Sequence, residues 1–378
     1  MAVSLPIAEL RTPCLLLDEE KMRRNIEVMR DGLKRLGVPL RPHVKTAKCI
    51  EAARAMVEGQ PGGITVSTLA EADFFLRHGF TDILYAVGIA PGRLPQVAEL
   101  ASRGACMSII LDSVEAARAV ADFTAPTGVE IGVFIEIDSG GHRAGVDCRD
   151  PVLIEIARAL APARSARLQG VLVHAGQSYD CADTECIAQV AEEERRQAVA
   201  AAEMLRASGF DAPIVSVGST PTATFARSLE GVSEVRAGVY VFHDLVMAGL
   251  GVCTIKDIAM SVLTTVIGSS AGKVVVNAGW TALSRDRGTS SHAVDQFYGL
   301  VCDADGTPLG DLVVRETNQE HGVIGRRDGS PFEASRFPVG TRLRILPNHA
   351  CATATMHDRF QVLRDGVVMD EWKRCGGW

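Results

Sequence analysis

The segment LRPHVK, residues 40–45, has the composition of a short β-strand and ends on a lysine. It is the first of eight short β-rich runs that alternate with Ala- and Glu-rich amphipathic stretches. The other seven are GITVST (63–68), DILYAV (82–87), CMSIIL (106–111), IGVFIEID (131–138), LQGVLVHAG (168–176), PIVSVGS (213–219) and VRAGVYVF (235–242). Parallel strands joined by helical crossovers produce this alternation. Eight such units predict an α/β fold with a (β/α)8 TIM barrel.

A doubly wound open sheet is the alternative fold, but no G-x-G-x-x-G follows the first strand and the strand count is high. Beyond about residue 250 the pattern changes to β runs punctuated by Gly and Pro, such as SVLTTVIG at 261–268. We therefore predict a barrel domain over residues 1–250 and a C-terminal β domain over residues 251–378. The run near residues 12–18 belongs to the barrel or pairs with the β domain.

The composition is that of an ordinary folded protein, with 47% hydrophobic and 22% charged residues in 378. A net charge of -7 provides no basic surface for nucleic acid. The opening MAVSLPIAEL lacks the features of a signal peptide, and no apolar run reaches the ~20 residues that span a bilayer. We therefore predict a cytoplasmic protein that binds neither nucleic acid nor membrane.

Ten cysteines are scattered from Cys14 to Cys375 without a C-x-x-C pair. A chain of this length folds without disulfides. We therefore expect most of the cysteines to be small buried apolar groups.

Barrel enzymes carry their chemistry at the C-terminal ends of the strands. Lys45 ends the first predicted strand, and strand alternation places Arg41, His43 and Lys45 on one face, with Lys48 in the following loop. An amine that merely reaches the rim of the barrel is the alternative interpretation of Lys45.

The later strand ends carry further polar groups. EIDSGGHRAGV offers Arg143, HAGQSY offers His174, Gln177 and Tyr179, and VGSTPT offers a glycine and hydroxyl groups before a helix. Barrel proteins often hold a phosphate after strands seven and eight, although a G-S-T turn alone is more often a helix N-cap. A lysine facing a phosphate site suits pyridoxal 5′-phosphate (PLP), whose aldehyde reacts with lysine.

A family resemblance extends this interpretation over nearly the full chain. It is carried by TPCLLLD, RPHVKTAK, TVSTLAEAD, EIDSGGHRAGV, HAGQSY, VGSTPT, EVRAGVYVF, NQEHG and LPNHACAT. These segments resemble the fold type III PLP enzymes of the D-threonine aldolase and D-serine dehydratase family, a branch related to alanine racemase. The resemblance implies an alanine-racemase-like barrel and β domain, PLP as cofactor, and a homodimer.

The same resemblance implies roles for individual residues. It makes Lys45 the Schiff-base lysine and places Arg143 and Tyr179 beside the cofactor. The phosphate end is assigned to Gly218, Ser219, Thr220, Gly238 and Tyr240, and Val239 joins the cofactor-binding candidates. His43, His174 and Gln177 are further candidates; His43 also suits a polar layer of the barrel core, and the sequence does not show which residue faces the pyridine nitrogen.

PNHAC, residues 347–351, suggests a metal site. His349 and Cys351 are two apart on a predicted strand, so their side chains would point the same way, and imidazole with thiolate suits zinc. Spacing alone favours a buried structural pair, since zinc takes about four ligands, unless water and substrate complete an open site. The resemblance implies a divalent metal, with zinc as first choice and magnesium or manganese as alternatives. Aldolase members resemble this motif with aspartate where Cys351 stands, so the cysteine is similar to the dehydratase branch.

Together these features predict a lyase that dehydrates D-β-hydroxy amino acids, such as 3-hydroxy-D-aspartate or D-serine, to a keto acid and ammonia. The metal would act as a Lewis acid on the leaving hydroxyl. Retro-aldol cleavage of the D-threonine aldolase type is one alternative. A non-catalytic PLP-binding carrier is another, which the chain beyond residue 250 disfavours.

Two further motifs each allow both a structural and a functional interpretation. Glu320 and His321 in NQEHG suit a structural turn as well as a site. Arg285 and Arg287 in SRDRGTSSH are surface arginines or partners for a substrate's second carboxylate, and the surface role is favoured. The sequence does not choose among 3-hydroxy-D-aspartate, D-serine and D-threonine.

Overall fold

The structure, a computed structural model, describes residues 5–141, 143–270 and 272–378. It divides into two compact units. The barrel unit comprises Val28–Gly238 and Cys375–Trp378, and the sheet unit comprises Met1–Glu27 and Val239–Arg374. Helix α1 (Glu19–Arg35) contributes residues to both units. The chain passes between the units after Gly238, ahead of the boundary that the sequence predicts near residue 250.

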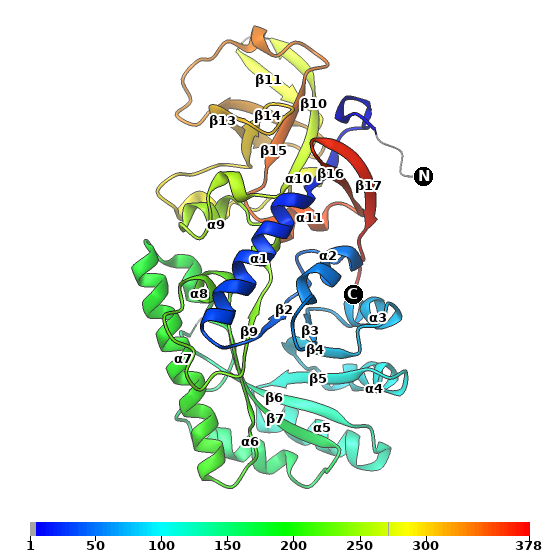
Figure 1. The fold of residues 1–378 in the computed structure, drawn as a ribbon, viewed down its shortest axis with the longest axis vertical. Coiled ribbons are helices and arrows are strands. Elements are labelled where there is room, and N and C mark those ends of the chain that lie inside the picture. The colour runs from blue at the N-terminus through cyan, green and yellow to red at the C-terminus, as the bar shows by residue number, and fades with distance from the viewer. Residues whose placement is uncertain (1–4, 142, 271) are drawn as a thin grey trace. The chain divides into compact units, whose positions relative to one another are not determined.

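An eight-stranded parallel sheet forms the barrel unit, in the order β2-β9-β8-β7-β6-β5-β4-β3 (Figure 1). Its outermost strands, β2 and β3, meet through a parallel bridge between His43 and Thr65. Val44 N donates to Thr65 O at 2.9 Å in this bridge. The sheet thereby nearly closes, which confirms the predicted TIM barrel. The strands are β2 (Leu40–Pro42), β3 (Ile64–Val66), β4 (Asp82–Gly88), β5 (Cys106–Leu111), β6 (Ile131–Ile137), β7 (Ala166–Val173), β8 (Ile214–Val217) and β9 (Glu234–Ala237).

Helices connect the barrel strands, and Figure 1 shows the long α7 alongside them. Strands such as β6 are buried along nearly their whole length, because a parallel barrel sheet is covered on both faces. Leu84, Ile110, Phe134 and Leu172, one from each of four adjacent strands, form one hydrophobic cluster. The helices are α2 (Ile50–Val57), α3 (Leu69–Arg77), α4 (Leu94–Ser102), α5 (Val114–Thr127), α6 (Val152–Leu160), α7 (Thr184–Ala207) and α8 (Thr220–Phe225), with 3₁₀ turns at Pro91–Arg93 and Gly176–Asp180.

The first barrel strand is shorter than LRPHVK predicts. It ends at Pro42, His43 makes only the isolated bridge, and Lys45 lies in the turn that follows. Pairing with β9 covers Leu40–Pro42, His43 N still donates to Ala237 O at 2.8 Å, and the chain then enters a turn in which Lys48 N donates to Val44 O at 2.8 Å. The prediction that Lys45 lies on the strand itself is therefore wrong, although the turn still follows the strand's C-terminal end.

Buried polar side chains are linked within the barrel unit. Arg236 Nη1 donates to Ser216 Oγ at 2.8 Å, and Ser216 Oγ donates to Glu234 Oε1 at 2.7 Å. Arg41 Nε donates to Glu234 Oε2 at 2.8 Å, and its other nitrogens pair with Asp82. Arg41 therefore has structural partners, and the network satisfies charges that would be costly to bury alone.

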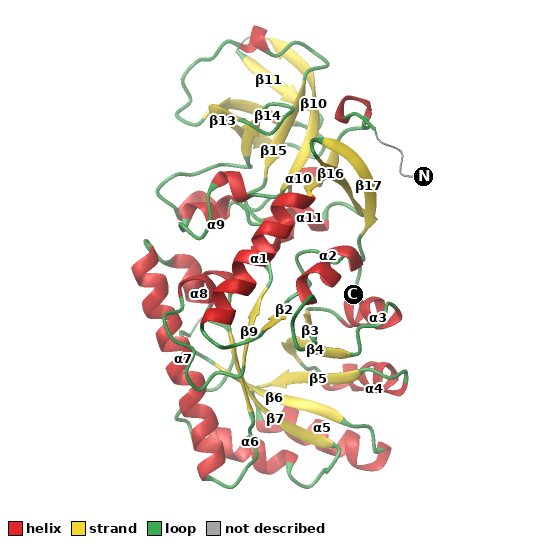
Figure 2. Cartoon of the chain, viewed as in Figure 1, coloured by secondary structure: helices red, strands yellow, loops and turns green. Residues whose placement is uncertain are grey.

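The sheet unit is a mostly antiparallel nine-stranded sheet. Figure 2 shows that strands predominate over helices there. Strand β1 pairs with β10 and β16, so the run at 12–18 joins this sheet. Leu16, Leu263, Leu363 and Val368 belong to one of its buried clusters. Its elements are β1 (Cys14–Asp18), β10 (Met260–Ser270), β11 (Lys273–Val276), β12 (Leu300–Cys302), β13 (Pro308–Thr317), β14 (Gly322–Arg326), β15 (Arg342–Leu346), β16 (Arg359–Arg364), β17 (Val367–Lys373), α9 (Leu245–Gly249), α10 (Trp280–Leu283) and α11 (Ala350–Thr355), with 3₁₀ turns at Ile7–Glu9, Val239–Val241, Ile255–Asp257, Gly288–Ser291 and Ala334–Arg336.

The cysteines differ from the expectation in two respects. Cys181 and Cys186 form a disulfide across the start of α7, where their Cα atoms are 5.6 Å apart and within bonding range. Of the free cysteines only Cys49, Cys148 and Cys302 are buried. The prediction of mostly buried, unpaired cysteines is therefore wrong, because the sequence pattern does not show which side chains a helix start brings together. Among the described residues, no helix is long and apolar enough to cross a bilayer.

Candidate functional site

Lys45 and Lys48 have different surroundings in the barrel unit. Lys48 Nζ pairs with the buried Glu71 at 3.0 Å. Lys45 is half-buried and makes no hydrogen bond or ion pair with the residues that the structure describes. An amine without a partner can react, whereas Lys48 is engaged in a structural pair.

Two histidines lie close enough to Lys45 for its charge to act on them. Burial, followed by the charges of Lys45 and Arg236, holds the pKa of His43 well below its usual range. Burial also lowers the pKa of His174 to about 3, although a hydrogen bond to Gly218 opposes it. His174 Nδ1 lies 3.1 Å from Gly218 O, and since a carbonyl only accepts, Nδ1 carries the proton. Neutral His174 therefore keeps Nε2 as an acceptor.

This histidine should make stability depend on pH. Its pKa is depressed in the folded protein, so its contribution is present above the unfolded pKa of about 6.5 and is lost as the pH falls toward 3. Between pH 7 and pH 5 we expect the wild type to lose about 2 kcal/mol more unfolding free energy than His174→Gln. Denaturant unfolding at both pH values measures this. The exposed His78 provides the control His78→Gln, and identical pH slopes for wild type and His174→Gln would refute the expectation.

Two predicted phosphate-end glycines lie where backbones approach closely. Gly218 has φ +130°, and a Cβ there would lie 2.3 Å from Arg236 O. A Cβ on Gly238 would lie 2.7 Å from His43 O. Side chains are thus excluded where the ends of β8 and β9 meet their neighbours. Ser219 caps α8 by accepting from Thr222 N at 3.2 Å, and Thr220, the first residue of α8, is buried.

The loops after β6 and β7 are joined by Gln177. Its Nε2 donates to Ser139 O at 2.9 Å, and its buried Oε1 has no hydrogen-bond partner among the described residues. Tyr179 is half-buried in the same 3₁₀ turn. Arg143 is exposed in the loop after β6, and its charge contributes to lowering the pKa of His174, after burial and the charges of Lys45 and Arg236.

Val239 and Tyr240 belong to the sheet unit, in the 3₁₀ turn after β9. Tyr240 is fully buried, which raises the pKa of its hydroxyl. The barrel unit thus contains His43, Lys45, Arg143, His174, Gln177, Tyr179, Gly218, Ser219, Thr220 and Gly238.

His349 and Cys351 lie in the sheet unit, but not on a strand. Strand β15 ends at Leu346, His349 is the N-cap of α11, and Cys351 lies in its first turn. The prediction that both lie on one strand is wrong, because PNHAC begins a helix. The two side chains still meet: burial opposes charge on His349, but hydrogen bonds with Asp286 and Cys351 raise its pKa to about 11.

Asp286 orients His349. Its Oδ2 lies 3.0 Å from His349 Nδ1, which must carry the proton toward the carboxylate. A metal would therefore bind at Nε2 in place of its proton, the arrangement common to metal-bound histidines. Asn348 supports the loop by donating to Asp286 O at 3.1 Å and accepting from Thr289 Oγ1 at 3.0 Å. Asp286 lies between the two arginines of SRDRGTSSH, and no motif in the sequence marks it as a partner of His349.

The arginines beside Asp286 have partners of their own. Arg287 pairs with Asp295 at 2.6 Å and lies over Phe297, with 4.9 Å to the ring centroid. Arg285 is exposed and lies over Trp280 at 4.6 Å. Within the described ranges, no group of three or more His, Cys, Asp or Glu side chains could hold a metal. A metal at His349 and Cys351 would therefore need water or substrate to complete its shell.

NQEHG forms the turn between β13 and β14. Asn318 N donates to His321 O at 2.8 Å, and both Glu320 and His321 are exposed. Thr281 Oγ1 donates to Gln319 O at 2.7 Å, which fastens the turn to α10. These contacts describe a structural turn.

Two family models match the chain. Residues 17–245 match "Alanine racemase, N-terminal domain", and residues 259–363 match "Putative serine dehydratase domain". D-threo-3-hydroxyaspartate dehydratase of Delftia sp. (strain HT23) is 50% identical over 374 residues, covering 98% of each chain. D-serine dehydratase of Dictyostelium discoideum is 31% identical over 395 residues, again covering 98% of each chain.

A solved structure of a similar protein has the same fold as this chain. It is a D-threo-3-hydroxyaspartate dehydratase variant with a cysteine replaced by alanine, in the metal-free form. It superposes with a TM-score of 0.96 at 50% identity, covering 99% of this chain and 100% of that chain. The likeness extends over both units of the present chain.

Proposed function

The chain belongs to the family that combines an alanine racemase N-terminal domain with a serine dehydratase domain, and from this membership we propose that it is a PLP- and divalent-metal-dependent dehydratase of D-β-hydroxy amino acids. Relatives named dehydratases are carbon–oxygen lyases. The proposed reaction is of the D-threo-3-hydroxyaspartate dehydratase type, giving a keto acid and ammonia. The observation that carries the proposal is the imidazole and thiol pair of His349 and Cys351, oriented by Asp286.

The barrel residues fit PLP. Among the described residues, the Lys45 amine has no hydrogen-bond or ion-pair partner. The buried Gln177 Oε1 has no hydrogen-bond donor there either. Neutral His174 offers an acceptor nitrogen. We propose that these residues hold the cofactor together with His43, Arg143, Tyr179 and the phosphate-end group of Gly218, Ser219, Thr220, Gly238, Val239 and Tyr240. PLP supplies the electron sink for the Cα carbanion when bound.

The sheet-unit residues fit a divalent metal by donor chemistry. Thiolate and imidazole are ligands of zinc, and magnesium or manganese would be less suited to the thiolate. Asp286 holds one proton of His349 on Nδ1, so Nε2 would be the metal-binding nitrogen once it has lost its own proton. The metal-free relative is a cysteine-to-alanine variant, which supports Cys351 as a ligand here. A metal at this pair would supply Lewis acidity toward the leaving hydroxyl.

The chain's own groups then have defined tasks in the proposal. Lys45 Nζ would take the proton from the substrate Cα. His174 stays neutral at pH 7, so it accepts a hydrogen bond rather than adding charge. Arg236 remains tied to Ser216 and to Val173 O at 2.6 Å, so its role is structural.

A substrate panel tests the proposal. The protein loaded with PLP and zinc is incubated with 3-hydroxy-D-aspartate, D-serine and D-threonine, and keto acid, ammonia and glycine are assayed. We expect ammonia and keto acid in equal amounts, with little glycine, because Cys351 resembles the dehydratase branch. The L-isomers provide the matched control.

Glycine with an aldehyde as the main products would instead move the assignment to the aldolase reaction. PLP binding without turnover of any substrate would support the alternative of a non-catalytic PLP-binding carrier. The homodimer and the cytoplasmic location stay predictions.

A further inference from the structure

Glu194 is a buried carboxylate in α7 whose hydrogen-bond partners include two backbone amides. It is 2% exposed and lies in the buried stripe of the helix, between Ala191 and Ala198. Its Oε1 accepts from Ala175 N at 3.0 Å and from Gly218 N at 2.9 Å. A buried carboxylate is costly unless its hydrogen bonds are satisfied, so its contacts indicate what it stabilises.

The two amides belong to loops that carry candidate site residues. Ala175 follows His174 after β7, and Gly218 precedes Ser219 after β8. The peptide groups of Gly218 are held on both sides, because Glu194 accepts from its N–H while His174 Nδ1 donates to its C=O at 3.1 Å. One carboxylate therefore fixes the spacing of the two loops.

Thr222 extends this connection into α8. Its hydroxyl accepts from Ser219 N at 3.0 Å and also hydrogen-bonds Glu194. Ser219 Oγ lies 3.1 Å from Ser178 Oγ, which joins the two loops a second time. Displacing Glu194 would release Gly218, Ser219 and the first turn of α8 together.

We propose that Glu194 is a positioning residue that holds the Gly218–Thr220 segment in the geometry that receives the phosphate of the cofactor. The inference rests on the proposed function, because it takes the cofactor to be PLP. Glu194 itself does not contact the cofactor; it acts through the backbone of Ala175 and Gly218. Burial raises the pKa of the Glu194 carboxyl, while the hydrogen bonds from the Ala175 and Gly218 amides oppose this shift by stabilising the charged form.

The test compares binding of PLP and of pyridoxal, which lacks the phosphate, to the purified full-length protein. Glu194→Ala leaves two buried amides without an acceptor, so we expect PLP to bind about 10- to 100-fold more weakly. Pyridoxal affinity should change less than about threefold. Glu194→Gln should restore PLP affinity, because one amide oxygen can accept both hydrogen bonds.

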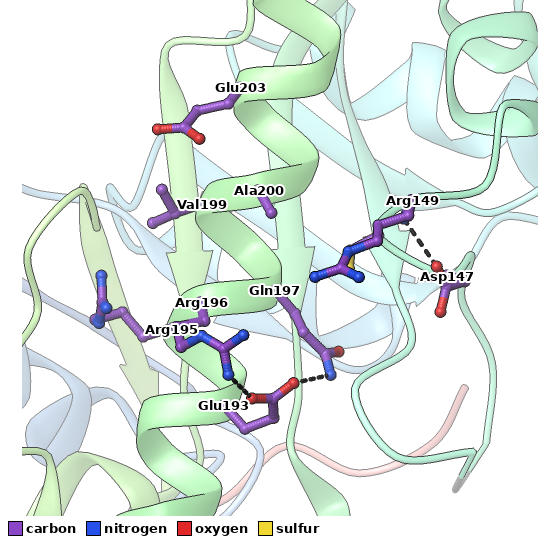
Figure 3. Close-up of a pocket in the computed structure, with 10 residues that line it drawn as sticks. Asp147, Arg149, Glu193, Arg195, Arg196, Gln197, Val199, Ala200 and Glu203 are labelled. Carbon is purple, nitrogen blue, oxygen red and sulfur yellow. Dashed lines mark hydrogen bonds and ion pairs between the residues drawn. The ribbon is translucent and has the colours of Figure 1, made fainter.

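Glu193→Ala is the matched control. Glu193 is the neighbouring residue of α7, but it accepts from Arg196 and Gln197 and lines an outer pocket with Asp147, Arg149 and Glu203 (Figure 3). Its removal should leave the affinity for both ligands unchanged. If Glu194→Ala does not fold, Thr222→Val removes one hydroxyl of the same network and should show the same selective loss.

Equal losses for PLP and pyridoxal, or no loss for PLP, would overturn the positioning role. A wild-type protein that binds no PLP would instead overturn the proposed function. The two failures are therefore distinguishable.

Discussion

Replacing Lys45 with alanine is expected to lower turnover by at least about 10³-fold, because one amine both attaches the cofactor and moves the substrate proton. The variant should lose the yellow chromophore of the lysine-bound cofactor while its unfolding transition stays close to that of the wild type. Borohydride reduction of the wild type should fix PLP to the peptide that contains Lys45. A keto-acid assay, absorbance, thermal unfolding and mass mapping measure the four effects.

Lys48→Arg is the control for this prediction. Lys48 is three positions away and pairs with the buried Glu71 at 3.0 Å, so arginine retains the charge that Glu71 requires. This variant should keep its chromophore and its activity within a few fold of the wild type. PLP recovered on Lys48 rather than Lys45 would contradict the assignment of the reactive lysine. A protein that stays colourless when PLP is added would contradict the assignment of PLP as the cofactor.

Replacing Cys351 with alanine is expected to remove the metal and to lower dehydration by at least about 10²-fold, since the leaving hydroxide loses its Lewis acid. Metal content by elemental analysis and ammonia release are the measurements. The yellow colour should persist, because Lys45 and Cys351 belong to different units. Chelation of the wild type should have the same effect, reversed by zinc.

Two variants control the Cys351 experiment. Cys253→Ala removes another half-buried thiol of the sheet unit and should leave metal content and activity unchanged. Cys351→Asp supplies an oxygen ligand, so it should bind a harder metal such as manganese and lose dehydration. Turnover that resists chelators, or full metal content in Cys351→Ala, would show that this cysteine is not a ligand.

Only those site residues that belong to a recognisable sequence motif could be predicted from the sequence. Lys45 and the turn around Ser219 follow apolar runs, so the barrel rule that strand ends carry chemistry pointed to them directly. Asp286 and Glu194 have no such signal. Asp286 lies between two arginines, which are the more conspicuous candidates for binding a substrate carboxylate. Glu194 is the one acidic residue in the alanine-rich buried stripe of α7.

The strand count, the parallel barrel and the family can be predicted from the amino-acid sequence, because apolar runs, their breaks and short motifs are local properties of the chain. The end of the first strand cannot, since it depends on the length of the pairing with β9 and on the His43–Thr65 bridge. The folded structure was also needed to show that His349 begins a helix, that Asp286 orients it, and that Cys181 meets Cys186. The same holds for Glu194, whose partners Ala175 and Gly218 lie in two different loops. Such contacts depend on where distant segments meet in space, which the period of a single segment does not encode.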